Sequence, residues 1–522
     1  MMRIFQAGLF LALAACGAST PTVAASSDPP FTIATVASFD SPWAMTFLPG
    51  SGVKLTNAAL VTEKPGRIWL IDVATGRKKP VSGAPRVVVS SQGGLLDIAA
   101  APSFAGDRAV YLTYSEPSAN SGSGLALARA RLVDLATGPR LDGLTVLWHD
   151  PAGGKGGQFG AKIAFAPDGQ SLFLSSGERQ RFTPAQDSSQ PLGKILHLTL
   201  DGKPAPGNPF AGKVGAATVA VTDPPRDTVA AKTAASRQFS WPGPNLTPAE
   251  TWSTGHRNPY GLAFAPDGRL WEHEMGPRGG DEVNLILRGR NYGWPNVSNG
   301  SNYDGVDIPD HRAGDGYEAP KVWWDPSVSP AGMIIYTGDL FPQWKGDALL
   351  GALSGEAFIH VEIRGDQASK ADQWDMGHRI REVEQGPRGG DEVNLILPGR
   401  NYGWPNRSNG SNYNGVTIPD HAPGDGYEAP KLFWNPSVSP AGMIIYTGDL
   451  FGQWKGDALL GALSGEALIH VTIRGDQASK TDQWDMAHRI REVEQGPRGE
   501  VYLLEDGNGG RLLRLEPVQT RR

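Results

Sequence analysis

A tandem repeat of 110 residues is the feature that most limits what this chain can fold into. Residues 276–385 and 386–495 carry the same letter at 96 of 110 aligned positions. The repeats of solenoids and propellers usually keep only their structural positions alike, but these two copies also share loop letters such as SNGSNY. We therefore interpret them as a recent tandem duplication of part of an older gene.

Short strands joined by tight turns are the predicted local structure. The 522 residues include 67 Gly and 42 Pro, about a fifth of the chain against a usual share of roughly an eighth, which excludes a bundle of long helices. Apolar runs at 162–165 and 261–264 each lead into Pro-Asp-Gly and a second apolar run. Pro presets such a turn and Gly supplies a positive φ, so each segment predicts a hairpin. Recurring hairpins predict an all-β fold, and a β-propeller is favoured over a large sandwich.

The charge balance and the aromatic content narrow the class of protein. The formal net charge is −6, and the sequence has no long basic run. Nucleic acid is therefore excluded as an expected partner. The 15 Trp residues argue against a disordered chain, which is poor in aromatics.

The N-terminus is expected to direct export. Residues 1–15 form a short apolar run with one Arg, which is typical of a signal peptide and too short to span a bilayer as a helix. The run ends in Leu-Ala-Ala-Cys, and Cys16, the only cysteine of the chain, resembles the lipidated residue of a bacterial lipobox. The alternative is an ordinary signal cut near residues 23–25. Residues 16–30 are predicted to be a flexible tether, and the expected location is the periplasm, with a lipid anchor as the only membrane contact.

Four unusual loop segments carry a family resemblance. They are QGGLLD at 92–97, GHRNP at 255–259, GPRGGDE at 276–282 with its copy at 386–392, and HRIR at 378–381 with its copy at 488–491. In this order they resemble the soluble quinoprotein sugar dehydrogenases, also called the glucose/sorbosone dehydrogenase family. The resemblance runs over nearly all of residues 31–522. It implies a six-bladed β-propeller with pyrroloquinoline quinone (PQQ) and calcium at one end of its central channel.

The resemblance also assigns residues that bind the cofactor. PQQ carries three carboxylates, and the planar fork of Arg suits carboxylates. The implied contacts come from one glutamine, one Arg-Asn pair and two arginine pairs at spacing i, i+2, which point the same way on a strand. They are Gln92, Arg257, Asn258, Arg379 with Arg381, and Arg489 with Arg491.

Calcium ligands are implied by the same resemblance. Calcium takes six to eight oxygen ligands, many of them backbone carbonyls. The carbonyls of a Gly-Pro pair bind the cofactor's calcium in the family, and a second calcium uses a Glu and, ten residues on, a Tyr carbonyl. The matching residues are Gly276, Pro277, Glu282 and Tyr292, or Gly386, Pro387, Glu392 and Tyr402 in the second copy.

Two positions depart from the family pattern. Gln158 stands where the family has its general base, a His. An amide cannot take up a proton near neutral pH, and general base catalysis typically contributes ~100- to 10,000-fold. By the same resemblance Gln158 and Arg257 are the catalytic candidates, and the loss of the base leads us to expect slow turnover. Ser354, with Ser464 in the copy, replaces a Lys that contacts the cofactor in many relatives.

The duplication enlarges or distorts the expected ring. Each copy contains about six strand-like runs, whereas two four-stranded blades need eight. An eight-bladed ring and a six-bladed ring with one copy displaced both remain open, as does the question of which copy supplies the site.

The expected function is oxidation of the C1 hydroxyl of aldose sugars to lactones by a PQQ- and calcium-dependent dehydrogenase. Its partners would be the sugar and an external electron acceptor. Two alternatives stay open: a non-catalytic propeller lipoprotein that binds a sugar or a partner, and a calcium-dependent propeller lactonase.

Overall fold

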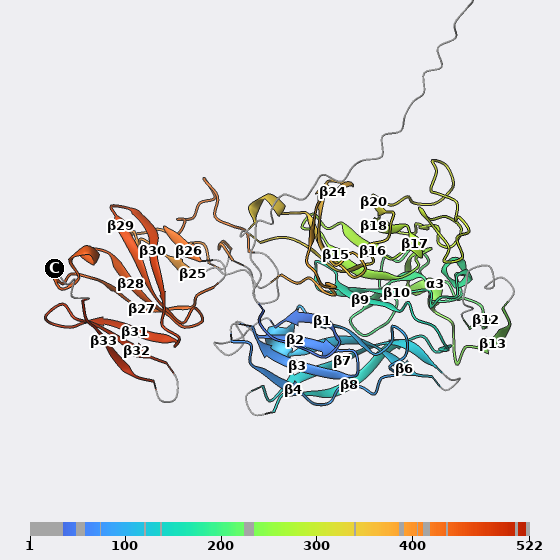
Figure 1. The fold of residues 1–522 in the computed structure, drawn as a ribbon, viewed down its shortest axis with the longest axis horizontal. Helices are drawn as coiled ribbons and strands as arrows, with labels where there is room; N and C mark the ends of the chain where they lie inside the picture. Colours follow the sequence, from blue (N-terminus) through green and yellow to red (C-terminus); the bar gives the residue numbers. More distant parts are fainter. Residues whose placement is uncertain are drawn as a thin grey trace, which may run out of the picture.

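The structure, a computed structural model, is built almost wholly from antiparallel strands (Figure 1). It describes residues 35–48, 58–73, 75–118, 122–135, 138–223, 234–338, 341–385, 391–404, 406–410, 418–434, 437–506 and 510–517. The predicted signal peptide, Cys16 and the tether lie outside these residues. Among the described residues, no helix has the length and apolar character needed to cross a membrane.

Five four-stranded sheets form the larger body, drawn from blue to yellow in Figure 1. Their strands, in chain order, are β1 Pro42–Phe47, β2 Ala58–Glu63, β3 Arg67–Asp72 and β4 Lys78–Val81; β5 Leu95–Ala100, β6 Ala109–Pro117, β7 Ser123–Val133 and β8 Arg140–His149; β9 Gly160–Phe165, β10 Ser171–Ser176, β11 Lys194–Thr199 and β14 Thr251–Thr254; β15 Pro259–Phe264, β16 Leu270–Glu274, β18 Asp281–Ile286 and β20 Val322–Trp324; and β21 Pro330–Ile335, β22 Ala348–Ala352, β23 Ala357–Arg364 and β24 Gln367–Asp375.

The second copy of the repeat forms a smaller body, which lies beside the first in Figure 1. Its sheets are β25 Asp391–Val393 with β26 Leu432–Trp434; β27 Pro440–Ile445, β28 Ala458–Ala462, β29 Ala467–Arg474 and β30 Gln477–Asp485; and β31 Ile490–Gln495, β32 Val501–Glu505 and β33 Leu512–Leu515. The described strands of the second copy thus lie outside the larger body, whereas a ring of six blades stays a prediction.

Short elements decorate both bodies. Two-stranded ribbons and single helical turns make up this set: β12 Thr218–Thr222 with β13 Ser236–Ser240, β17 Arg278–Gly279 with β19 Gly300–Ser301, α1 Phe104–Asp107, α3 Thr247–Glu250, and the 3-10 turns η1 Thr183–Gln186, η2 Pro342–Trp344 and η3 Gly452–Trp454.

Both predicted hairpins are present. β9 pairs with β10 and β15 with β16, each across its Pro-Asp-Gly turn. The turn glycines Gly169 and Gly268 have φ of 68° and 86°, the left-handed region that a side chain disfavours. The all-β class and the propeller type are thus confirmed, and the count of six blades stays a prediction, because the larger body has five four-stranded sheets among its described residues.

The first strand of each sheet faces the centre of the larger body. β1 contacts β5, β5 contacts β9, β9 contacts β15 and β15 contacts β21. The sheets pack face to face through apolar clusters, one of which joins Leu96, Ile163, Tyr260 and Ala331 from four different sheets. This arrangement places the first strands around one central channel.

Candidate active site and metal site

Six segments line the narrow central cavity of the larger body. Five of them are first strands, and the sixth is residues 380–385 of the first copy, which do not form a strand. The lining residues include Trp43, Asp97, Lys162, Tyr260, Gly332 and Arg381. The first copy therefore closes the channel.

A buried ion cluster fixes residues 380–385 in this position. Lys162 Nζ lies 3.2 Å from an oxygen of Asp97 and 2.9 Å from Glu382 Oε2. Burial alone would lower the pKa of Lys162, but the two carboxylates raise it above its ordinary value. The ammonium group thus stays charged and ties the first copy to β5 and β9.

Gln92 and Gln158 meet at one end of the channel. Gln92 Oε1 accepts hydrogen bonds from the Gln158 backbone N–H at 2.7 Å and from the Tyr260 hydroxyl at 3.0 Å. Gln158 is 4% exposed and has a φ of 53°, an uncommon conformation for a residue other than glycine. The structure thus brings together these two predicted site residues, although their roles stay predictions.

Glu178 is a neighbour of Gln158 that the sequence interpretation missed. In the orientation that satisfies the amide of Gln158, Nε2 donates to Glu178 Oε1, and Oε1 accepts from Arg257 Nη2 at 2.8 Å. Burial raises the pKa of Glu178 to about 6. Its only sequence signal is an acidic residue two positions after the end of strand β10, in Ser-Ser-Gly-Glu. The site therefore contains an ionisable group next to the glutamine that replaces the expected base.

Arg257 reaches from Gln158 to the Gly-Pro turn. Its Nη1 donates to the carbonyls of Met275 at 2.7 Å and Gly276 at 2.8 Å. Its guanidinium lies 5.2 Å from the ring centre of Trp294. The neighbouring Asn258 accepts a hydrogen bond from the Gly160 backbone N–H at 3.3 Å. Both members of the predicted Arg-Asn pair are therefore at this end of the channel.

Three of the four predicted calcium ligands share a second small cavity with Arg257. Gly276, Glu282 and Tyr292 all line it, whereas Pro277 does not. A Cβ atom on Gly276 would lie 2.1 Å from the Gly279 carbonyl oxygen, so only glycine fits this turn. The corresponding residues of the second copy do not gather in this way: Glu392 and Tyr402 are in the smaller body, and Gly386 and Pro387 lie outside the described residues.

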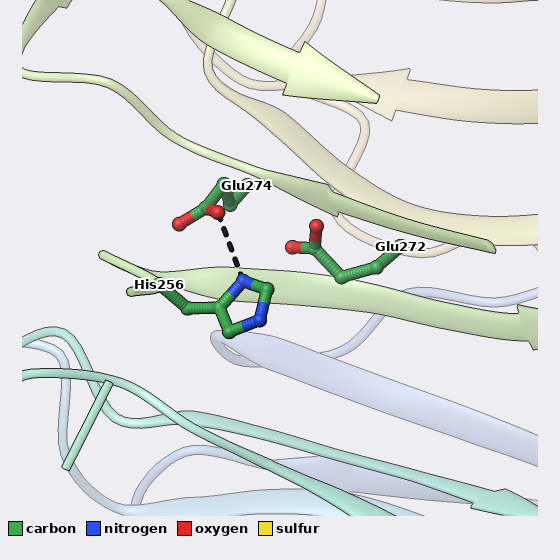
Figure 2. A group of neighbouring side chains, drawn as sticks. All are labelled: His256, Glu272 and Glu274. Atoms are coloured by element: carbon green, nitrogen blue, oxygen red, sulfur yellow. Dashed lines mark hydrogen bonds and ion pairs between the residues drawn. The ribbon is translucent and has the colours of Figure 1, made fainter. Parts of the chain in front are cut away.

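A buried cluster of one histidine and two glutamates adjoins this cavity (Figure 2). One ligand atom from each of His256, Glu272 and Glu274 lies within 4.8 Å of the others. Glu282 on β18 is opposite Glu274 on β16. Burial, together with repulsion from Glu274, raises the pKa of both Glu272 and Glu282 well above the ordinary value.

The donor set of this cluster fits a hard cation. Glu272 Oε1 and the side-chain oxygen of Asn284 are buried without a hydrogen-bond partner. Carboxylate and amide oxygens are calcium ligands, and a cation would offset the cost of burying several acids together. Glu272 and Glu274 were not predicted from the sequence. The signal was available, since residues i and i+2 of a strand face the same side.

The arginine pairs of the two copies lie in different surroundings. The Arg381 guanidinium is 4.3 Å from the ring centre of Trp43 on β1, and burial lowers its pKa. Arg379 is exposed, yet near enough to affect that pKa. Arg489 and Arg491 instead both bind Asp506 at 2.9 Å in the smaller body. The structure thus brings Arg381 to the channel, with Arg379 exposed nearby, and not the second pair.

The serines that replace the family lysine behave alike in both copies. Ser354 and Ser464 each lie 2.8 Å from a second serine hydroxyl, that of Ser329 or Ser439. Neither offers a charge to a cofactor carboxylate.

Comparisons with known proteins agree with this geometry. The profile of the family described as Glucose / Sorbosone dehydrogenase matches residues 39–237, 242–387 and 382–514. An aldose sugar dehydrogenase of Escherichia coli, YliI, is 35% identical over 355 residues, which cover 67% of this chain and 85% of that protein. The quinoprotein glucose dehydrogenase B of Acinetobacter calcoaceticus is 29% identical over 276 residues, covering 46% of this chain and 50% of that protein.

A solved structure shares the fold. The PQQ-bound aldose sugar dehydrogenase of Streptomyces coelicolor superposes with a TM-score of 0.51 at 28% identity, covering 68% of this chain and 88% of that one. The sheets surround a central channel, and arginines lie at one end of that channel. The protein is therefore a β-propeller of the sugar dehydrogenase type. The chain belongs to the glucose/sorbosone dehydrogenase family.

Proposed function

We propose that this protein is a quinoprotein that oxidises the C1 hydroxyl of aldose sugars to lactones, with PQQ and calcium as cofactors. The observation that carries the proposal is the convergence of Arg257, Gly276, Glu282 and Tyr292 on one cavity, in a chain of this family. The relative from Streptomyces coelicolor, described as PQQ-bound, supports the choice of cofactor.

The residues that would hold the cofactors follow from their charges. PQQ is anionic, and Arg257 and Arg381 offer guanidinium forks at the channel. The Gly276 carbonyl and the Glu282 carboxylate suit calcium. In the structure the Arg257 guanidinium donates to that carbonyl at 2.8 Å, so it would have to release Gly276 when a cation binds there. When bound, the quinone supplies the two-electron acceptor for the sugar's C1 hydride, and an external acceptor reoxidises it.

The site lacks the family's histidine base, which would accept the proton of the sugar hydroxyl. Gln158 orients substrate through hydrogen bonds and cannot hold the proton. Glu178, hydrogen-bonded to Gln158, is the ionisable group beside it. It is fully buried and accepts backbone hydrogen bonds from Gln180 and two following residues. We therefore expect slow oxidation by the wild-type protein.

The test replaces the glutamine with the family's base. Gln158→His should raise the rate of dye reduction with glucose by at most ~100-fold, the low end of the general-base range, since its neighbours do not orient an imidazole. The gain should grow with pH through about 6.5. Steady-state rates from pH 5 to 9, with PQQ and calcium added, measure it. Gln170→His, on the exposed turn between β9 and β10, is the matched control.

The other outcomes of that assay separate the rival functions. A lactonase would act on lactones without PQQ, and a non-catalytic binder would neither reduce dye nor hydrolyse lactone. A wild type as fast as its relatives would show that another group is the base. No binding of PQQ by the wild type would overturn the proposal.

Export and anchoring belong to the same proposal. Cys16 ends a short apolar run, and a lipidated cysteine with two or more acyl chains is sufficient for stable membrane attachment. Cys16→Ser should release the protein from the membrane fraction and abolish a lipid mass shift. Unchanged fractionation and mass would remove the anchor from the account.

A further inference from the structure

Two identical segments have different roles in this molecule. Residues 380–385 and 490–495 both read IREVEQ. The first closes the channel without forming a strand, whereas the second is β31, which carries β32 and β33 beside it. The sixth position of the ring therefore holds a single segment, while the strands that would complete a sheet there belong to the smaller body.

Each segment makes the same contact with the sheet before it. The backbone N–H of Thr337 donates to Gln385 Oε1 at 2.8 Å, and that of Thr447 donates to Gln495 Oε1 at 2.8 Å. The sheet β27–β30 with β31 is therefore arranged like the sheet β21–β24 with residues 380–385. Each sheet, together with the segment that follows it, therefore makes the same contacts between sheet and segment.

The second copy exposes the face that the first copy buries against the ring. Met333 is 2% exposed and Met443 is 51% exposed, although both lie in the strand sequence PAGMII. β21 packs on β15, whereas the main contacts of β27 with other described strands are with β28 and β31. The occupant that fits the exposed face of β27 is thus β15 of the same chain.

A short connection couples the sheet to the segment. Only residues 486–489 separate β30 from β31, and such a link spans roughly 18 Å at most. β31 cannot enter the ring unless β27–β30 follows it, so the two would enter together and displace β21–β24. The chain would have to leave the ring in the first copy and return to it in the second. The loop at 303–306 suits the point of departure, because Tyr303 is 64% exposed and Val306 51% exposed. The preceding letters SNGSNY are the same in both copies.

We propose that the two copies compete for one place in the ring. In the alternative form, β26–β30 and β31–β33 replace β20–β24 and residues 380–385, and the displaced segment of the first copy leaves the larger body at the exposed loop 303–306. The alternative ring has six multi-stranded sheets. It brings Arg491 to Trp43 together with its partner Asp506, so the acidic partner of the arginine pair enters the channel end only in this form.

Cross-linking distinguishes the two forms without any cofactor. Lys64 Nζ and the Arg381 guanidinium lie over the same Trp43 ring, at 6.0 and 4.3 Å from its centre. In a Cys16→Ser chain, which has no other cysteine, we pair Lys64→Cys with Arg381→Cys or with Arg491→Cys. A short thiol cross-linker and mass spectrometry of the linked peptides then report which copy is in the ring.

The competition is forced with matched substitutions. Met333→Asp, which places a charge in the core of the first copy, should move the cross-link from position 381 to position 491 while the thermal unfolding transition persists. Met443→Asp should leave the cross-link at 381. The double variant should lose both links and the transition.

Two results would overturn the proposal. Met333→Asp could lose the 381 link without gaining the 491 link, or the 491 link could form only between two chains, seen as a dimer on a denaturing gel. Because no step uses PQQ, failure here leaves the proposed function intact, and failure of PQQ binding leaves this test intact.

Discussion

The two copies of the repeat have nearly the same letters and bury them differently. Within each copy the strand pairing is the same: Leu350 pairs with Ile359, and Leu460 with Ile469. Between sheets the copies diverge, since Trp294 is 4% exposed and its counterpart Trp404 is 69% exposed. Local sequence therefore sets the register of paired strands, whereas the burial of a side chain depends on which sheet packs against its own.

The neighbouring sheet also decides which copy carries the site. Glu282 lies in a sheet completed by β15 and β16, which precede the repeat and occur once, and Tyr292 lies in the segment that follows Glu282's strand β18. Their counterparts in the second copy lack those two strands, because the duplicated segment begins after them. Duplication of part of a ring thus copies letters without copying the site.

The largest expected effect is a difference in stability loss when the equivalent tryptophans of the two copies are replaced. Trp294→Ala should lower the free energy of unfolding by about 3–5 kcal/mol, because it empties a buried site between Phe182 and Arg257. Trp404→Ala, the matched control, should cost less than about 0.5 kcal/mol, as exposed positions do. Denaturant unfolding of both variants measures the difference. Equal losses would show that both copies are packed alike.

The second prediction concerns the pH dependence of stability that comes from Glu178, which precedes the repeat and therefore occurs once. Glu178 has its pKa raised to about 6 by burial, so the folded state holds its proton more tightly than the unfolded state does. Its contribution to the free energy of unfolding should fall by about 2 kcal/mol in total as pH rises from well below 4.5 to well above 6, with about 1.3 kcal/mol of that loss between pH 4.5 and 6. Glu178→Gln should flatten that part of the stability curve. An unchanged slope in the variant would assign the pH dependence to another group.

The smallest effect concerns the displaced arginine pair. Asp506→Asn should lower the stability of the smaller body by less than about 1 kcal/mol, because its partners Arg489 and Arg491 are partly exposed and such ion pairs contribute little. Thermal unfolding at low and high salt measures it. A loss well above this value would place the pair in a buried setting, as in the alternative ring.

The sequence predicted the strands and the hairpins well, because Pro-Asp-Gly turns and apolar runs act locally. It also indicated that Gln92, Gln158, Arg257 and Asn258 belong together, and the structure brings them to one end of the channel. The choice between copies was beyond the sequence, since identical letters cannot say which strand packs on β15. Glu178 was missed for a related reason: its contact with Gln158 crosses from one strand end to another and has no fixed spacing.

The central claim is that the first copy, with the unduplicated sheets, forms the cofactor site. Titration of PQQ in the presence of calcium into Arg381→Ala and Arg491→Ala tests it most directly. The account predicts that Arg381→Ala binds PQQ about 10- to 100-fold more weakly than the wild type, the cost of one charge-assisted contact. Arg491→Ala should bind as the wild type does. Weakened binding by Arg491→Ala with wild-type binding by Arg381→Ala would contradict the account.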